Sequence, residues 1–136
     1  MHYMLDSSPV AVRVINSKTR AVVFANPSYS SMFHIAPDKL KSFKVQDIYQ
    51  NVDDLNAILQ RLNEGETILN TPIGMRTLDG KDVWVQASYI PITYAGELCT
   101  LAWFFDVTEI RHARELAENA TRIAVEKLGI MIENCL

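Results

Sequence analysis

The sequence has 136 residues, of which 49% are hydrophobic and 21% charged, and its formal net charge is -3. A chain of this length and composition is expected to form one globular domain with an apolar core, which excludes an intrinsically disordered protein. The sequence shows no apolar run of about 18 residues and no basic start typical of a secretory signal. Lys and Arg are scattered rather than clustered, so we expect neither a nucleic-acid partner nor direct membrane contact.

The first part of the chain predicts a hairpin followed by helices. Short β-branched runs at 10–15 and 21–25 predict two strands joined by a polar turn. The Asn-Pro pair that begins at Asn26 starts a helix over 27–33, because Asn caps a helix and Pro is tolerated in its first turn. Pro and Asp residues indicate short helical turns within 36–50.

The strongest helix signal in this part of the chain covers 52–64. Asn51 can cap this helix, acidic residues occupy its first turn, and Gly65 can end it. Its apolar residues have i, i+3, i+4, i+7 spacing, which favours core packing over a ligand site. These residues are Leu55, Ile58, Leu59 and Leu62.

Three strands are predicted next, over 68–77, 83–92 and 98–106. The Asp-Gly pair that ends at Gly80 predicts a two-residue hairpin turn with positive φ at both positions. Gly96 predicts a second turn before the last strand. This last strand is apolar on both faces, so we expect it to be central in a sheet. Helices would cover one face, and a further helix or a second subunit the other.

Residues 107–134 predict a long helix, because no Gly or Pro interrupts residues 97–128. Opposite charges recur four residues apart, as in Arg111 and Glu115, and support a helix. Apolar residues at seven-residue spacing form a narrow seam that needs a partner, which predicts a coiled coil in a homodimer. The seam comprises Ile110, Ala113, Ala117, Ala120, Ala124 and Met131, with Leu116, Ile123, Leu128 and Ile130 beside it.

The two cysteines, Cys99 and Cys135, form no C-x-x-C pair and lie in segments of different character. This spacing argues against a disulfide scaffold and against a structural zinc site, so we expect free thiols and no metal. Free thiols suit a reducing compartment. We therefore expect a cytoplasmic protein, or the cytoplasmic part of a membrane receptor.

Four short segments carry a resemblance to a known family. They are residues 5–10 (LDSSPV), 23–29 (VFANPSY), 77–85 (TLDGKDVWV) and 106–109 (DVTE). In this order they resemble the first segment, the second strand with its Asn-led helix, the "DG" hairpin followed by Trp, and the exit motif of PAS domains. The resemblance spans about residues 5–109.

The resemblance implies an α+β fold: a five-stranded antiparallel sheet in the order 2-1-5-4-3, with helices on one face, and a long C-terminal helix. It divides the chain into an N-terminal lead-in over 1–9, a PAS sensor domain over 10–106 and a signalling helix over 107–136. Between the helices and the sheet it implies an apolar cavity.

The resemblance also implies a role in bacterial signal transduction, such as a two-component system. PAS modules pass a signal to an output domain in the same polypeptide, for example a histidine kinase, a diguanylate cyclase or a chemoreceptor signalling region. No such output lies in this chain. The last predicted helix is still apolar and has no obvious cap over 130–136, so we expect the chain to be a fragment. The signal would leave through the exit residues Asp106, Val107, Thr108 and Glu109.

The residues argue against catalysis. Asp53 and Asp54 diverge on the surface of a helix, unlike a convergent acid and base. No spacing places a nucleophile beside a base, and the glycines are isolated turn formers rather than a phosphate loop. We therefore predict no enzyme activity and no catalytic residues.

Cofactor binding finds little support either. Haem-binding relatives supply an axial His from their helices, but residues 36–64 contain no His, which leaves His34 as the candidate. Flavin photoreceptors of the family need a Cys on a short helix, whereas no Cys precedes Cys99. Trp84 and Trp103 could stack on a flavin, although core packing is the simpler role. We expect no cofactor.

A ligand in the implied cavity would find a few polar groups on an apolar wall, as in most small-molecule sites. We expect its polar group to meet Asn26, Ser88 or Tyr89. The apolar wall would comprise Met32, Phe33, Leu59 and Leu62, together with one face of the last strand: Cys99, Leu101, Trp103 and Phe105, or the alternate face.

Three functions remain open from the sequence. The first is a small-molecule sensor that dimerises and relays a signal through its C-terminal helix. The second is an unliganded dimerisation or protein-interaction module, and the third is a flavin or haem sensor of redox state or gas.

Overall fold

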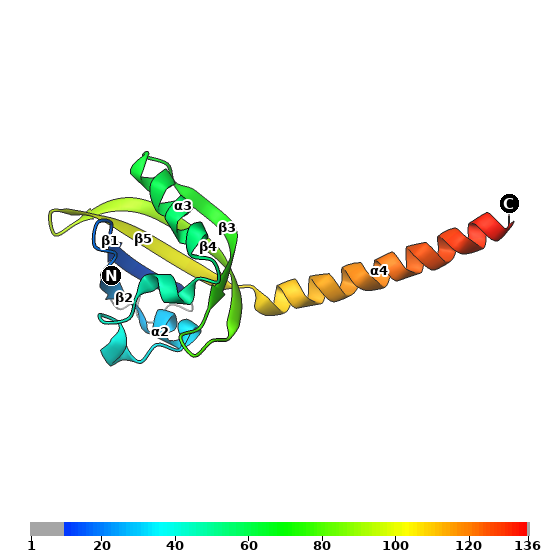
Figure 1. The fold of residues 1–136 in the computed structure, drawn as a ribbon, viewed down its shortest axis with the longest axis horizontal. Helices are drawn as coiled ribbons and strands as arrows, with labels where there is room; N and C mark the ends of the chain where they lie inside the picture. Colours follow the sequence, from blue (N-terminus) through cyan, green and yellow to red (C-terminus); the bar gives the residue numbers. More distant parts are fainter. Residues whose placement is uncertain (1–9, 136) are drawn as a thin grey trace. The chain divides into compact units, whose positions relative to one another are not determined.

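The structure is a computed structural model that describes residues 10–135, with side chains as far as Lys127. The strands are β1 (Ala11–Asn16), β2 (Val22–Ala25), β3 (Ile68–Arg76), β4 (Asp82–Tyr94) and β5 (Glu97–Asp106). The helices are α2 (Pro27–Phe33), the 3-10 helices η1 (Pro37–Lys39) and η2 (Val45–Ile48), α3 (Val52–Asn63) and α4 (Thr108–Cys135) (Figure 1). The predicted lead-in over 1–9 lies outside the described residues.

The strands form one antiparallel sheet in the order β2-β1-β5-β4-β3, which confirms the predicted topology. β5 is central, as expected for a strand that is apolar on both faces, and pairs with β1 on one edge and β4 on the other. The register places Ala102 of β5 opposite both Arg13 of β1 and Tyr89 of β4. Directly opposed residues in a sheet share a face, so these three side chains lie on the same side.

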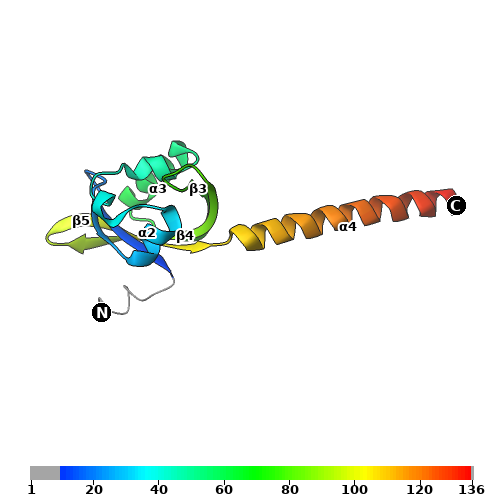
Figure 2. The same ribbon diagram turned by 90° about the horizontal axis from the view of Figure 1, so that it is seen from below.

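One face of the sheet packs against the helices and forms the core (Figure 2). Alternation along β1 sends Ala11 and Ile15 to this face, and the register brings Phe104 beside Ala11. The predicted stripe of α3 packs here, since all four of its apolar residues belong to the core. The helices therefore cover one face of the sheet, as predicted.

Both helix caps follow the sequence prediction. Asn26 accepts a hydrogen bond from the Tyr29 amide at the start of α2, and Asn51 accepts one from the Asp53 amide at the start of α3. Each cap satisfies an amide that has no partner within its own helix. These caps explain why both helices begin where the sequence predicts.

The hairpin between β3 and β4 differs from the prediction, whereas the second predicted turn lies at Gly96 as expected. The β3–β4 connection covers residues 77–81, and only Gly80 of the Asp-Gly pair has a positive φ (97°). The predicted two-residue turn is therefore wrong here, because Thr77 closes a longer loop by bonding Lys81 through both its amide and its hydroxyl. The tight turn is instead Ala95-Gly96, with φ values of 52° and 79°, between β4 and β5.

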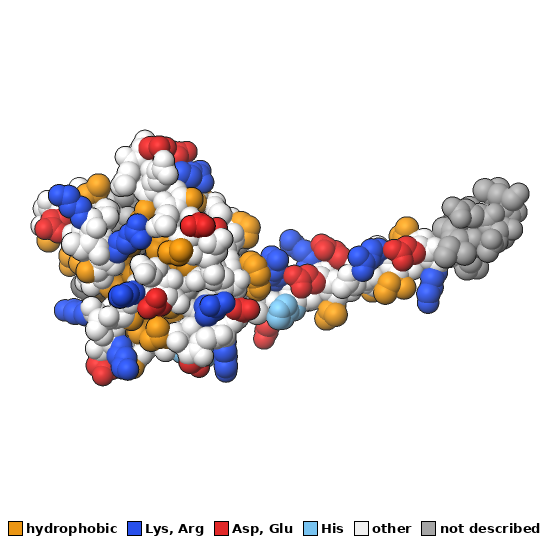
Figure 3. All heavy atoms as spheres, viewed as in Figure 1, with side chains coloured by type: hydrophobic (Ala, Val, Ile, Leu, Met, Phe, Trp, Pro, Cys, Tyr) orange, Lys and Arg blue, Asp and Glu red, His pale blue; other side chains and the backbone are white. Residues whose placement is uncertain are grey.

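α4 belongs to a second compact unit of the chain, and this unit begins at Val107, one residue before the helix. Acidic and basic side chains lie next to one another along this helix in Figure 3, and apolar side chains are exposed between them. Arg111 and Glu115 form an i, i+4 ion pair with 3.1 Å between Nε and Oε1. Side chains of the predicted seam beyond Lys127, namely Leu128, Ile130 and Met131, lie outside the described residues.

Candidate ligand site in the core

Arg13 lies inside the core. Among the described residues it is the one buried side chain that carries a charge, and its exposed fraction is 0%. It occupies β1 between Ala11 and Ile15, so strand alternation turns it toward the helices. β1 is paired on both edges, which leaves the guanidinium with no edge from which to reach solvent.

Two tyrosine hydroxyls bond the guanidinium, and a third extends the network. Nη1 of Arg13 donates to the Tyr29 hydroxyl at 3.1 Å, and Nη2 donates to the Tyr49 hydroxyl at 2.6 Å. The Tyr49 and Tyr89 hydroxyl oxygens are 2.8 Å apart and share a hydrogen bond. We call this group of buried side chains, Arg13 with Tyr29, Tyr49, Tyr89 and Phe104, the Arg13 cluster.

Aromatic rings enclose the guanidinium carbon. It lies 5.0 Å from the centre of the Phe104 ring, 5.6 Å from that of Tyr49 and 5.8 Å from that of Tyr29. A cation within about 6 Å of a ring face is attracted by the ring quadrupole. The rings therefore stabilise the charge in place of water.

The charge has no anionic partner in the described part of the chain. None of the ion pairs found among residues 10–127 includes Arg13, and its Nε has no hydrogen-bond partner. Burial raises the pKa of Tyr29 and, more strongly, the pKa of Tyr89, so these phenols stay neutral at neutral pH. A guanidinium remains protonated in proteins. The core thus holds a positive charge among neutral groups.

Asn26 fixes the position of Tyr29. Its Oδ1 accepts from the Tyr29 amide at 3.0 Å and from the Val12 amide at 2.9 Å, while its Nδ2 donates to the Val10 carbonyl at 2.8 Å. One side chain therefore joins the first turn of α2 to β1. This connection holds the Tyr29 ring over the strand that carries Arg13.

Tyr49 is placed by the short connection between η2 and α3. Tyr49 forms an isolated bridge with Met75 of β3, and the Gln50 side chain donates to the Met75 carbonyl at 2.9 Å. The Gln50 amide also donates to the Gly74 carbonyl at 3.2 Å. Gly74 leaves room for the Gln50 side chain, because a Cβ at this position would lie 2.7 Å from Oε1 of Gln50.

Several predicted pocket residues lie in the core. Tyr89 belongs to the Arg13 cluster, and Met32 packs on the core as a partly buried side chain. Phe33, Leu59 and Leu62 are members of the core. Their role in binding a ligand stays a prediction.

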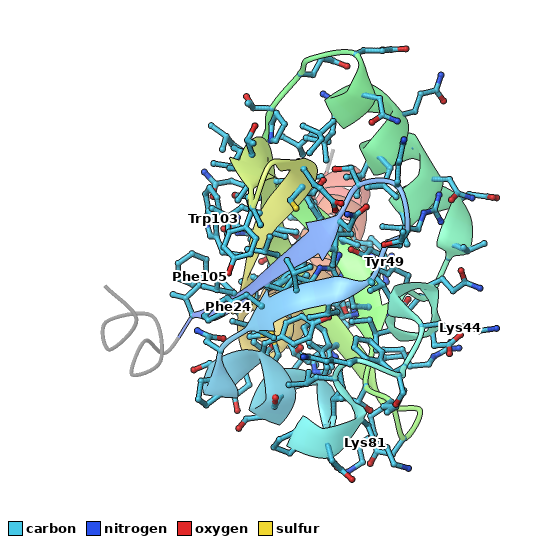
Figure 4. The ribbon with its side chains drawn as sticks, turned by 90° about the vertical axis from the view of Figure 1, so that its left-hand side faces the viewer. Phe24, Lys44, Tyr49, Lys81, Trp103 and Phe105 are labelled. Atoms are coloured by element: carbon cyan, nitrogen blue, oxygen red, sulfur yellow. The ribbon has the colours of Figure 1, made fainter. Side chains whose placement is uncertain are left out.

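The predicted face of β5 requires a correction. Leu101 lies opposite Val14 and Trp103 opposite Val12, so they point away from the helices. Phe105 shares this outer face, and Figure 4 shows Trp103 and Phe105 on the side of the sheet opposite Tyr49. Cys99 follows the same alternation and is a buried free thiol. The alternate face of β5 enters the core, because its residues are paired with Arg13 and Ala11.

The two other predicted polar contacts have structural partners. The Asn26 side chain bonds the backbone groups of Val10, Val12 and Tyr29, as described above. Ser88 lies opposite Trp103 on the outer face, and its hydroxyl accepts from the Asn70 amide at 2.9 Å. Asn70 has φ 51° within the irregular part of β3, so Ser88 stabilises a bulge.

Three members of the cluster were not predicted from the sequence, namely Arg13, Tyr29 and Tyr49, whereas Phe104 lies on the alternate face of the last strand that the prediction left open. A signal for Arg13 existed, because it is the only charged residue within the apolar run VAVRVI. The tyrosines gave no comparable signal, since an isolated Tyr in a helix or loop is ordinary.

No group of three His, Cys, Asp or Glu residues that could hold a metal occurs in the part of the chain that the structure describes. His34 lies outside the core, where its Nδ1 is 2.9 Å from Oδ1 of Asp79, and half of each side chain is exposed. The candidate haem ligand is therefore turned to the surface. No helix within residues 10–135 is long and apolar enough to cross a membrane.

The exit residues follow directly from the core strand. Asp106 ends β5 opposite Val85, Val107 connects, and Thr108 and Glu109 begin α4. Phe104 of the Arg13 cluster lies on the same strand, two positions before Asp106.

A family model described as PAS fold matches residues 5–112. The chain belongs to this family. The match includes every strand of the sheet and the start of α4, and it confirms the family predicted from the four motifs. No curated protein sequence matches the chain significantly.

Solved PAS domains share this fold. A PAS domain from a two-component sensor histidine kinase is 15% identical, with 77% of this chain and 91% of that chain covered and a TM-score of 0.66. The PAS domain of nitrogen regulation protein NR(II) from Vibrio parahaemolyticus is 19% identical, with 77% and 95% covered and a TM-score of 0.64. An RNA-binding light-oxygen-voltage receptor is 17% identical, with 88% and 36% covered and a TM-score of 0.70. At these identities the likeness shows the fold alone.

Proposed function

We propose that the chain is the sensory module of a cytoplasmic signalling protein. In this proposal the Arg13 cluster receives a small molecule, and α4 carries the response within a homodimer to an output domain in the same polypeptide. The fold is that of a PAS sensor domain. The output we favour is a histidine kinase, because one of the similar structures comes from a two-component sensor histidine kinase. A diguanylate cyclase and a chemoreceptor signalling region are the alternatives.

One observation carries this proposal: the strand that packs on the cluster is the strand that leads into α4. The Phe104 ring lies 5.0 Å from the guanidinium carbon of Arg13 and 5.9 Å from the Tyr89 ring. Packed cores switch between discrete arrangements rather than deform continuously. A change in the cluster that moves Phe104 therefore acts on β5, and through Asp106 and Val107 on the first turn of α4.

α4 exposes apolar side chains that suit a second copy of the same helix. Leu116 and Ile123 are seven residues apart and are 71% and 48% exposed. Ala120 lies between them on the same stripe, and small residues let two helices approach closely. Ile110, near the start of the helix, is 62% exposed. A parallel pair of these helices would bury the stripe, so we assign the partner of α4 to a second protomer.

Sedimentation equilibrium of the whole chain tests this assignment. We expect a dimer for the unmodified chain and at least about tenfold weaker dimerisation for the double variant Leu116→Gln and Ile123→Gln, which is about 1.4 kcal/mol. The matched control changes two charged residues of the same helix, Glu118→Gln and Arg122→Gln, and should dimerise as the unmodified chain does. A monomer at every concentration in the unmodified chain contradicts the proposed homodimer.

A second candidate is an unliganded dimerisation module that uses the outer face of the sheet. Phe105 is 46% exposed on this face, beside Trp103 and near Phe24 in Figure 4. Phe105→Ser distinguishes the two candidates. It should leave dimerisation unchanged if α4 carries the contact, and should weaken it if the sheet face does.

A further inference from the structure

The guanidinium of Arg13 has unused donors in a place that water does not reach. A guanidinium carries five N–H donors in a planar fork, and the bonds to Tyr29 and Tyr49 account for one donor each on Nη1 and Nη2. Nε has no acceptor at all. Buried polar groups are normally paired, so an unpaired donor on a buried cation points to an acceptor that the described residues do not provide.

The tyrosine hydroxyls also retain hydrogens to donate. Tyr29 accepts from Arg13, which leaves its phenolic hydrogen free for another acceptor. Tyr49 and Tyr89 share one hydrogen bond, so the hydroxyl that accepts this bond keeps its own hydrogen to donate. Nε of Arg13, the Tyr29 hydroxyl and one hydroxyl of the Tyr49–Tyr89 pair therefore form a set of donors for which the described residues show no acceptor. This is the donor arrangement that an anion requires.

The single positive charge and the apolar walls of the site indicate which class of anion fits it. One guanidinium supplies one positive charge, so a monoanion would neutralise the site, whereas phosphate or sulfate would leave a buried negative charge. Phe104 and Phe33 form an apolar wall at 5.6 Å between ring centres. An aliphatic or aromatic body suits this wall better than a hydrated inorganic ion does.

We propose that the Arg13 cluster binds a small organic monocarboxylate, with the carboxylate accepting from Nε of Arg13 and from a tyrosine hydroxyl. This inference rests on the proposed sensory function and names the class of ligand that the same site takes. The site is closed in this structure, since Arg13 and Tyr29 are 0% exposed and Tyr89 1%. Binding therefore requires side chains to move. Tyr49, on the connection between η2 and α3, is the cluster member outside regular helix and strand.

Titration of the whole chain with sodium acetate, butyrate and benzoate tests the proposal. The readout is the NMR signal of the Arg13 Nε–H group, identified as the signal that the Arg13→Met variant lacks. Sodium chloride at equal ionic strength and the neutral amides acetamide, butyramide and benzamide are the controls. We expect a saturable shift of the Nε–H signal with at least one carboxylate and none with chloride or the matching amide.

Two variants separate a direct role of Arg13 from a loss of fold. Arg13→Met replaces a buried charge by an apolar side chain of similar length, a change that many cores tolerate, and should abolish carboxylate binding. Tyr29→Phe keeps the ring and removes one hydroxyl donor. It should weaken carboxylate binding roughly tenfold or more, because a hydrogen bond to a charged group is lost.

The outcomes distinguish this inference from the proposed function. Equal binding of an amide and its carboxylate overturns the anion class but leaves a sensory site in place. An unchanged Nε–H signal with every carboxylate, or tyrosinate absorption of the unliganded chain at neutral pH, overturns the inference, because the cluster then needs no external anion. Carboxylate binding together with unchanged dimerisation of the Leu116→Gln and Ile123→Gln variant supports the ligand and contradicts the proposed role of α4.

Discussion

The substitution Asn26→Ala is expected to lower the free energy of unfolding by about 3 kcal/mol. Asn26 is fully buried, and its side chain bonds the amides of Tyr29 and Val12 and the carbonyl of Val10. Each hydrogen bond contributes about 1 kcal/mol, and a buried donor left without an acceptor costs about 1–3 kcal/mol. The truncation removes all three bonds at once, which gives a loss of about 3 kcal/mol or more.

Asn51→Ala is the matched control for this prediction. Asn51 is also a helix N-cap, and its Oδ1 accepts from the Asp53 amide at 2.9 Å, but the side chain is exposed. Loss of an exposed cap costs about 1 kcal/mol. Urea unfolding followed by far-ultraviolet circular dichroism measures both variants, and a difference of about 2 kcal/mol between them is expected. Equal losses would refute the reasoning, because the bonds from Asn26 to β1 would then contribute nothing.

The same experiment decides the role of Asn26. If its bonds are structural, any effect on ligand binding should appear together with the loss of stability. A variant that keeps its stability and loses ligand binding would restore the contact predicted from the sequence.

Two further predictions concern stability. Gly74→Ala should destabilise the fold by about 1 kcal/mol in urea unfolding, because the new Cβ would displace the Gln50 side chain and break its hydrogen bond; an unchanged midpoint would contradict this. Hydrogen bonds from Thr77 and His34 hold the pKa of Asp79 below its ordinary value of 3.8. These two hydrogen bonds therefore stabilise the fold above pH 3.8, and this stabilisation is lost as the pH falls through the lowered pKa. Asp79→Asn should remove this part of the acid dependence of thermal unfolding, and an identical acid profile in the variant would show that these bonds do not matter.

Much of the fold could be predicted because its signals are local. The caps at Asn26 and Asn51 and the apolar stripe of α3 are properties of short segments, and they place both helices. The ends of strands were harder, since they depend on pairing. β4 continues to Tyr94 because the tight Ala95-Gly96 turn lets Tyr94 pair directly with Glu97.

The Arg13 cluster could not be predicted in the same way, because it depends on contacts between distant segments. Arg13 bonds Tyr29 sixteen residues away and Tyr49 thirty-six residues away. A charged residue in a strand is expected to face solvent unless the topology closes that face. Only the sheet order, which places β1 between β2 and β5, and the helices over it turn Arg13 into a buried cation.

The orientation of β5 shows that strand pairing supplies information that the hydrophobic pattern of the sequence lacks. Both faces of this strand are apolar, so hydrophobicity does not indicate which face enters the core. Side-chain size does. On the helix-covered face the register alternates large and small residues: Ala102 lies between Arg13 and Tyr89 across the sheet. Phe104 in turn lies between two alanines, one on β1 and one on β4. The small residues leave room for the guanidinium and the rings, so the alanines of the core face, rather than its large apolar residues, determine that a charge fits there.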